Sequence, residues 1–314
     1  MTVATMRRPP AEGSRDENRR DSPRTGRRFA ARMQRPGLWF ALPAAALLAL
    51  FFAYPLAVSL LQSFFRTSGG VSTFVGLDQY TRMFRDPLVL KSLGNALLIL
   101  VVQVPIMMAL AVGLAYLLNQ AWLRFRAGFR LLTFLPSITT LVAYSVVFRV
   151  IMTTDGGLLN QFLALFGAGS IDWLNNEWWA RVAVIASITW RWTGYNMVII
   201  LAGLQSIPAE LYEAARIDGA GRWQIFRHIV VPQLRPVLIF TSVTSTIGAL
   251  QLFDENFILT GGGPNNATLT PVLYLYKVGF QQFDFGYASA IAWMLVILTG
   301  IIAVIQFRIM REKP

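Results

Sequence analysis

The segment that decides the fold is ELYEAARIDGAGRWQIFRHIVVPQLRP, residues 210–236, a polar stretch between two long apolar runs. Glu210 and Glu213 lie where carboxylates favour the N-terminal end of a helix. Gly219 follows about ten residues later, and glycine readily adopts backbone angles that other residues avoid. The pattern therefore predicts a short helix over residues 210–219.

A second short helix is predicted over residues 223–231, ending at Pro232 because proline cannot continue a helix. Two membrane spans can be joined by only a few residues, so a helical hairpin here requires an explanation. It is either an amphipathic pair lying on the bilayer surface or a docking element for a soluble partner.

The composition is typical of an integral membrane protein. Of 314 residues, 55% are hydrophobic and 14% are charged, against about 25% charged in ordinary globular domains. The net charge of +12 could indicate nucleic-acid binding. However, ten of the 28 Lys and Arg residues precede residue 38 and most others flank apolar runs, which is typical of membrane orientation signals. We therefore expect membrane lipid, and no nucleic acid, among the partners.

Six apolar runs are long enough to cross the hydrocarbon core, which takes about 20 helical residues. The sequence predicts an all-α membrane protein with six transmembrane helices and a cytoplasmic coupling-helix hairpin (205–235) between spans four and five. Prolines within the runs are tolerated when neighbouring groups satisfy the freed carbonyls. The predicted spans are 38–62, 92–118, 129–151, 181–204, 236–259 and 286–308.

Positive charge predicts the orientation. If residues 1–37 are inside, the inner segments carry 19 Lys and Arg residues and the outer segments carry five. Both termini, including the tail 309–314, and the hairpin are thus expected in the cytoplasm. Residues 1–37 contain little to bury and read as a disordered basic tail. A signal peptide is the alternative, but the apolar run 38–61 exceeds the length of a signal-peptide core.

Polar residues within spans are costly and therefore suggest function. In the fourth predicted span, aromatic and amide side chains occur together, as a sugar-binding surface requires. The fifth predicted span contains a second polar group. The candidates for a substrate path are Arg191, Trp192, Tyr195, Asn196, Gln251, Asp254 and Glu255. In the alternative interpretation, Arg191 pairs with Asp254 or Glu255 and only holds the helices together. The hydroxyl residues of 241–246 are interpreted as helix-packing positions.

The sequence offers little for catalysis. No phosphate-binding Gly-rich loop ends in lysine, and no cluster of His, Asp or Glu has metal-ligand spacing. His228 is the one histidine, and there is no cysteine. We therefore expect no enzyme activity, no metal and no catalytic residue on this chain.

The hairpin resembles the EAA loop of ABC-importer permeases, with Val231 where that motif has leucine. Residues 259–264 (LTGGGP) and 285–290 (FGYASA) resemble the carbohydrate-uptake branch, relatives of the maltose- and lactose-type permeases, and the resemblance covers about 38–308. The matching loop positions, which the resemblance assigns to ATPase coupling, are Glu213, Ala214, Ala215, Asp218, Gly219, Ile229 and Pro232.

The resemblance implies a permease subunit in the cell inner membrane. Its partners would be a second homologous permease, a cytoplasmic ABC ATPase dimer and an extracytoplasmic solute-binding protein. This chain would hold no cofactor, since ATP and Mg would be bound by the ATPase. The resemblance also implies a carbohydrate substrate that contacts Trp192, Tyr195, Asn196 and Gln251.

Other functions remain open from the sequence. A sugar derivative such as glycerol 3-phosphate could be carried instead. An ATP-independent secondary transporter would need coupling-ion groups, and often has repeated halves, neither of which is visible. A membrane enzyme would need titratable residues facing one pocket. A structural anchor would not need polar residues at mid-membrane depth.

Overall fold

The computed structural model describes residues 40–68, 71–120 and 122–311, which form two compact units, 1–57 and 58–314. The described part of the first unit, 40–57, is helical, and all of its side chains are exposed. It belongs to the helix Phe40–Gln62, which includes the π-helical turn η1 (Ala49–Ala53) and α2 (Tyr54–Gln62). The predicted disordered tail, 1–37, and the last residues, 312–314, lie outside the described residues.

Among the described residues, three helices are long and apolar enough to cross a membrane: Phe40–Gln62, α4 (Pro87–Leu118) and α14, over Phe285–Ile309. Two bent pairs raise the number to as many as five. In the first pair, α5 (Arg126–Ile138) and α6 (Leu141–Ile151) meet at 98°; in the second, α8 (Glu177–Gln205) and α9 (Ala209–Ile217) meet at 70°. The count of six spans therefore stays a prediction.

The helix α11 (Val231–Leu250) occupies most of the fifth predicted span, 236–259, but ends nine residues earlier. Residues 251–253 are not helical, and a separate short helix, α12 (Asp254–Leu259), follows. Five hydroxyl side chains at 241–246 lower the hydropathy of α11.

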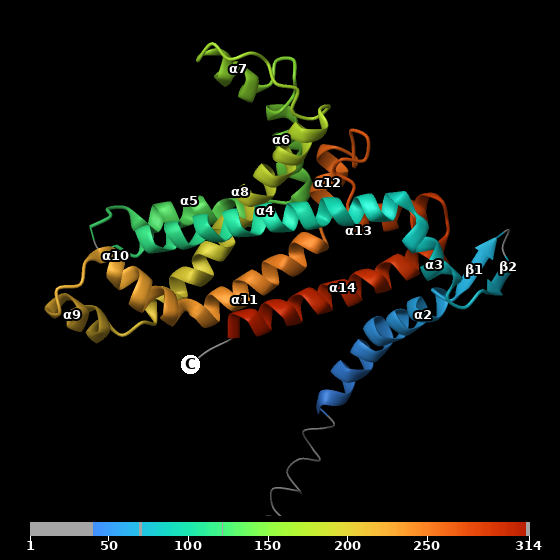
Figure 1. The fold of residues 1–314 in the computed structure, drawn as a ribbon, viewed down its shortest axis with the longest axis horizontal. Helices are drawn as coiled ribbons and strands as arrows, with labels where there is room; N and C mark the ends of the chain where they lie inside the picture. Colours follow the sequence, from blue (N-terminus) through green and yellow to red (C-terminus); the bar gives the residue numbers. More distant parts are fainter. Residues whose placement is uncertain (1–39, 69–70, 121, 312–314) are drawn as a thin grey trace, which may run out of the picture. The chain divides into compact units, whose positions relative to one another are not determined.

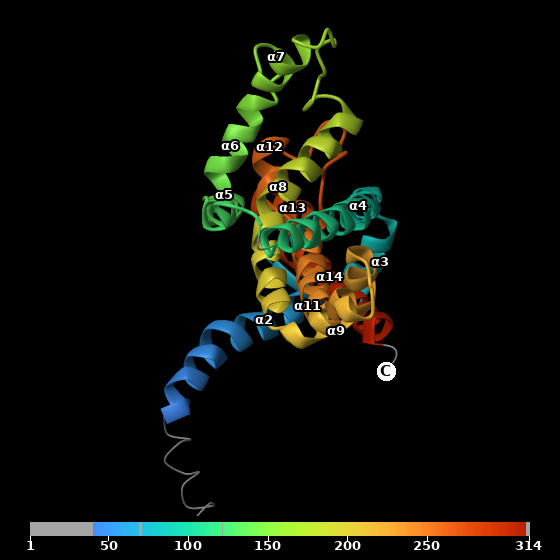
Figure 2. The ribbon, with the colours of Figure 1, turned by 90° about the vertical axis from the view of Figure 1, so that its left-hand side faces the viewer.

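The second unit is organised around α4 and α8, which pack against each other and against α5 and α11. In Figure 1, α4, α11 and α14 run alongside one another, while α6, α7 (Leu158–Ala164) and α12 extend to one side. Figure 2 shows that α8 runs from one of these groups to the other. A glycine makes the closest helix crossing possible. A Cβ atom on Gly194 of α8 would lie 1.7 Å from the carbonyl oxygen of Thr133 in α5.

Shorter elements cover the end of the helices where α4 begins. A two-stranded antiparallel hairpin pairs Phe65 with Phe74, a small addition to the predicted all-α fold. The carboxylate of Asp86 accepts hydrogen bonds from the hydroxyls of Tyr274 (2.6 Å) and Tyr287 (2.8 Å). These bonds join the start of α4 to α13 and α14. The elements here and in the connections are β1 (Phe65–Ser68), β2 (Val71–Phe74), α3 (Asp78–Arg85), α7 (Leu158–Ala164), α13 (Pro271–Tyr276), η3 (Lys277–Gln281) and α14 (Phe285–Arg311).

The predicted hairpin forms at the opposite end, where α14 also ends (Figure 1). Its first helix is α9, and its second begins as α10 (Arg222–Ile225). The prediction that the second helix ends at Pro232 is wrong. The π-helical turn η2 (Phe226–Val230) follows α10, and α11 continues from Val231 through the proline. The wide turn shifts the hydrogen-bond register, so that Pro232 lies in the first turn of α11. A residue in a first helical turn does not have to donate a backbone N–H, so proline is tolerated there.

Candidate functional site

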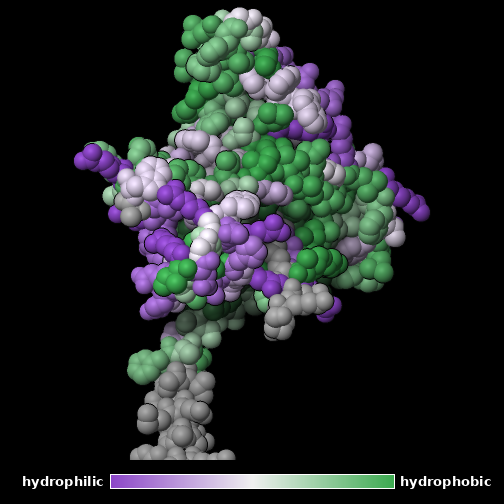
Figure 3. All heavy atoms as spheres, turned by 60° about the vertical axis from the view of Figure 1, so that its left-hand side comes forward, coloured by the Kyte–Doolittle hydropathy of each residue, from purple (hydrophilic) through white to green (hydrophobic). Residues whose placement is uncertain are grey.

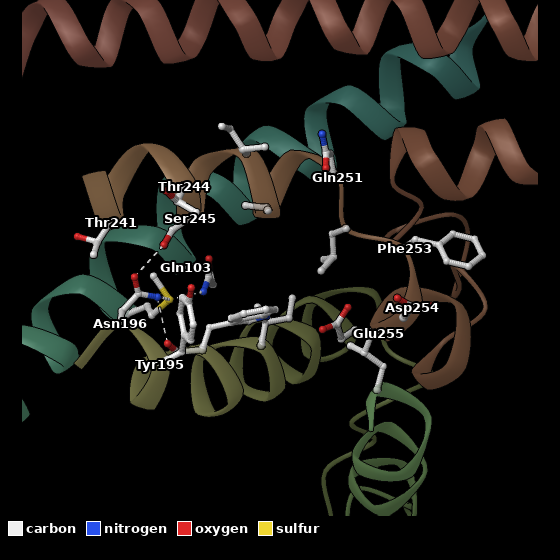
Figure 4. Close-up of a pocket in the computed structure, with 18 of the residues that line it drawn as sticks. Gln103, Tyr195, Asn196, Thr241, Thr244, Ser245, Gln251, Phe253, Asp254 and Glu255 are labelled. Carbon is white, nitrogen blue, oxygen red and sulfur yellow. Dashed lines mark hydrogen bonds between the residues drawn. The ribbon is translucent and has the colours of Figure 1, made fainter. Parts of the chain in front are cut away.

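A cavity of about 460 Å³ lies between α4, α8, α11 and the segment that joins α11 to α12. Six of the seven substrate-path candidates line it, although α8 and the 251–255 segment are far apart in sequence (Figure 4). Arg191 is the exception. The six are Trp192, Tyr195, Asn196, Gln251, Asp254 and Glu255.

Asn196 links three helices at one end of the cavity. Its side-chain nitrogen donates to the carbonyl oxygen of Trp192 at 3.1 Å and lies 3.5 Å from the sulfur of Met107 in α4. Its side-chain oxygen accepts from the hydroxyl of Ser245 in α11 at 3.3 Å. Since Asn196 is only 3% exposed, this set of contacts holds its amide in one orientation.

Aromatic and neutral polar groups share the cavity wall. The rings of Trp192 and Tyr195 meet edge to face, with centroids 5.8 Å apart, and Tyr195 is 38% exposed. Thr241, Thr244 and Ser245 of α11 also line the cavity, although the sequence indicated only helix packing for them. Thr246 does have a packing role, since Gln306 of α14 donates to its hydroxyl at 2.7 Å.

A hydrogen bond from Tyr144 of α6 to the Oε1 atom of Glu255, 2.5 Å long, joins α6 to α12. The guanidinium of Arg191 lies over the Tyr144 ring, 4.7 Å from its centroid. The alternative interpretation required Arg191 to pair with Asp254 or Glu255, but the described residues contain no such ion pair within 4.0 Å. Arg191 is buried behind the ring, at 6% exposure.

Sequence reasoning missed several lining residues. Gln103 of α4, 2% exposed, contributes an amide and lies 3.4 Å from the sulfur of Met107. It carries the same signal as the residues that were found, because it is a polar side chain inside an apolar run. Phe253 carries no such signal, since aromatic residues are ordinary in apolar segments. The same holds for Tyr144, which is not among the lining residues but donates to Glu255. Figure 4 shows Glu255 directed toward the cavity and Phe253 directed away from it.

The hairpin positions extend from α9 through the following loop to Ile229 in η2 and Pro232 in the first turn of α11. Gly219 has a positive φ of 79°, and the N–H groups of Gly219 and Ala220 donate back to Arg216 and Ala215. This is the Schellman arrangement that ends a helix with glycine. The loop then re-enters a helix, where the Gln224 side chain accepts from the Gly221 N–H at 2.7 Å.

The seven predicted coupling positions divide by exposure. Ala215 and Ile229 are half-buried and pack on the cluster of α4, α8 and α11. Glu213, Ala214, Asp218, Gly219 and Pro232 are exposed. Figure 3 brings this end of the helices forward and shows hydrophilic residues gathered over part of the face, with hydrophobic residues over much of the rest.

The sequence matches one family of known proteins over most of its length. The family described as "Binding-protein-dependent transport system inner membrane component" matches residues 38–312. The chain is 43% identical over 281 residues to the lactose transport system permease protein LacF of Rhizobium radiobacter, covering 88% of this chain and 94% of that protein. It is 37% identical to the arabinooligosaccharides transport system permease protein AraP of Halalkalibacterium halodurans, covering 81% and 80%.

The fold matches a solved membrane transporter. A chain of a bacterial ABC transporter involved in the import of the acidic polysaccharide alginate has a TM-score of 0.80, at 22% identity, over 90% of this chain and 98% of that one. This likeness shows a shared helical arrangement. Together with the family match over residues 38–312, it shows that this chain belongs to the inner-membrane permease components of binding-protein-dependent ABC transport systems.

Proposed function

We propose that this chain is one of two membrane subunits of an ATP-driven importer for a carbohydrate. The observation that carries the proposal is the cavity, which is lined by the aromatic rings of Trp192 and Tyr195 and by the amides of Asn196 and Gln251. Sugars present apolar C–H faces and many hydroxyl groups, which these two kinds of side chain recognise. The names of relatives, which refer to lactose and arabinooligosaccharides, support a carbohydrate substrate.

The substrate path is formed with a second, homologous permease. An extracytoplasmic solute-binding protein delivers the sugar; support comes from a solved alginate transporter in complex with its periplasmic protein, which has a TM-score of 0.78. The chain lies in the cytoplasmic membrane with both termini inside, as the excess of positive charge on the inner segments favours.

The energy comes from a cytoplasmic ATPase dimer, which binds ATP and Mg. The exposed face of α9, with Glu213 and Ala214, docks into the ATPase, and the small alanine side chain permits close approach. Gly219 ends this helix sharply enough for the chain to return to the membrane. Closure of the ATPase dimer shifts the hairpin and opens the cavity to one side of the membrane or the other. The chain itself catalyses no reaction.

The test is to purify the tagged chain from its own membranes in mild detergent, and to measure ATP hydrolysis and co-purifying subunits. A second permease and an ATPase are expected. The complex, reconstituted in liposomes with its solute-binding protein, should take up labelled sugar only when ATP is present. A chain that moves solute without an ATPase would contradict the proposal and favour a secondary transporter.

A further inference from the structure

The charges around the cavity point to the class of sugar that it accepts. Two carboxylates, Asp254 and Glu255, line the cavity, and among the described residues that line it there is no Lys, Arg or His. We propose that the cavity selects uncharged carbohydrates and rejects anionic ones. This inference rests on the proposed function and narrows its substrate class.

Neither carboxylate is neutralised by an ion pair. The ion pairs within 4.0 Å among the described residues are Arg66–Asp78 and Arg82–Asp284, both far from the cavity in sequence and fold. Glu255 is 3% exposed and accepts a hydrogen bond from Tyr144. A hydroxyl donor orients the carboxylate but does not cancel its charge.

Arg191 and Arg149 contact groups other than the two carboxylates. Arg191 lies behind the wall, with its guanidinium 4.7 Å from the Tyr144 ring centroid and 5.5 Å from that of Trp192. Among the described residues its Nε and Nη1 atoms have no hydrogen-bond partner, and it forms no ion pair with either carboxylate within 4.0 Å. Arg149 of α6 donates to the carbonyl oxygen of Ile258 and lines a different cavity. Asp254, Glu255 and Arg191 together carry a net charge of −1.

The remaining polar lining is neutral. It supplies amide and hydroxyl groups, which can donate to and accept from sugar hydroxyls. The carboxyl end of α11, which carries the partial negative charge of a helix C-terminus, reaches the same space at Gln251. These neutral groups are Gln103, Asn196, Gln251, Thr241, Thr244 and Ser245.

Within a low-dielectric membrane protein, like charges repel more strongly than in water, and an anion that entered would also lose its hydration. An uncharged sugar meets no charge repulsion, and the hydration that its hydroxyls lose costs far less than that of an anion. Glycerol 3-phosphate, which the sequence left open, is an anion and is therefore rejected. A carboxylated or sulfonated sugar is rejected for the same reason.

The experiment uses the complete complex of both permeases and the ATPase in lipid nanodiscs, without the solute-binding protein, so that binding reports on the membrane cavity. The probes are lactose, maltose and cellobiose, each paired with the analogue in which a carboxylate replaces the C6 hydroxymethyl group of its non-reducing sugar. Saturation-transfer NMR gives the dissociation constants. The variants are Asp254→Asn, Glu255→Gln and the double variant, and Asp155→Asn, a carboxylate lining the other cavity, is the matched control.

We expect the unmodified complex to bind at least one neutral sugar about tenfold more tightly than its carboxylate analogue. The double variant should reduce this ratio to below about threefold, by strengthening binding of the analogue, whereas Asp155→Asn should leave it unchanged. If Glu255→Gln prevents assembly, Asp254→Asn alone should still lower the ratio, since Asp254 does not hold Tyr144.

Two results would overturn the inference while leaving the proposed function intact. The first is equal binding of a sugar and its analogue by the unmodified complex. The second is a ratio that persists after both carboxylates are neutralised. Binding of no sugar from any pair would overturn the proposed carbohydrate function and this inference with it.

Discussion

Gly194 of α8 and Thr133 of α5 are in backbone contact: a Cβ atom at position 194 would lie 1.7 Å from the Thr133 carbonyl oxygen. The next residues on α8, Tyr195 and Asn196, line the cavity. The separation of α5 and α8 is therefore linked to the position of the cavity wall.

Gly194→Ala should push α5 away from α8. We expect destabilisation of about 1–3 kcal/mol, as for other overpacked contacts, and a lower rate of sugar uptake. The measurement is the melting temperature of the purified complex together with uptake in liposomes. Gly113→Ala is the control, since a Cβ atom there meets nothing within 4 Å. Equal melting temperatures for the two variants would contradict the prediction.

Gly219→Ala should weaken the end of α9, because an alanine at φ 79° is strained by about 1 kcal/mol. Less ATPase should then co-purify with the chain, while membrane insertion stays normal. Gly221→Ala tests whether any change of glycine in this loop has the same effect. Gly221 has no positive φ, and its added Cβ would meet only the Gln224 side chain, at 3.6 Å. The prediction fails if both variants retain the same amount of ATPase.

Gln251→Ala removes an exposed amide from the cavity wall, where α11 ends. The loss of one hydrogen bond to substrate should weaken apparent affinity about tenfold without loss of assembly. Uptake kinetics over a range of sugar concentrations would measure the change. Gln306→Ala, which removes a bond to Thr246 outside the cavity, should affect stability more than affinity. Unchanged kinetics for Gln251→Ala would remove this residue from the substrate path.

Asp86 should make stability depend on pH. Burial raises its pKa, but hydrogen bonds from Tyr274 and Tyr287 and from backbone N–H groups outweigh this effect and lower the pKa below its usual value. An aspartate of this kind stabilises the fold above its unfolded pKa, about 3.9, and the stabilisation is lost as pH falls through the lowered value.

The melting temperature of the unmodified chain should therefore exceed that of Asp86→Asn at pH 7, by about 2–4 °C. The gap should narrow as pH falls below about 4, where the unfolded chain begins to bind the proton, and should close once pH passes the lowered pKa of the folded protein. Calorimetry of both proteins from pH 7 to pH 3 would measure it. A gap that stays constant over this range would show that Asp86 does not act through its charge.

The sequence predicted the parts of this fold that depend on continuous or interrupted apolar runs. The helix α4 follows from its long apolar run. Polar cavity residues such as Asn196 and Gln251 were found because polar side chains in such runs are costly, and Trp192 and Tyr195 because aromatic rings beside amides suit a sugar. The break after Leu250 was not predicted, since the apolar run continues through Leu252 and Phe253. Only contacts with other helices decide where that helix ends.

The sequence pattern also did not predict contacts between helices that are far apart in the sequence. Tyr144 meets Glu255 across 111 residues, and nothing in the sequence distinguishes this tyrosine from an ordinary buried aromatic. The position of Arg191 was uncertain for the same reason, because spacing along one helix does not say which neighbour its side chain faces. The sequence did not predict that the helix continues through Pro232, because this depends on the wide turn η2 that precedes it.

That uninterrupted helix has a mechanical consequence. Residues 222–250 run from the hairpin to the cavity as a continuous stretch of helix, made of α10, η2 and α11, with one π-helical turn and two prolines, Pro232 and Pro236. It contains no glycine or loop hinge between Arg222 and Ser245, and the hydroxyl of Ser245 bonds Asn196 in the cavity wall. A displacement of the hairpin is therefore transmitted to the cavity wall through hydrogen-bonded helix, with no loop in between.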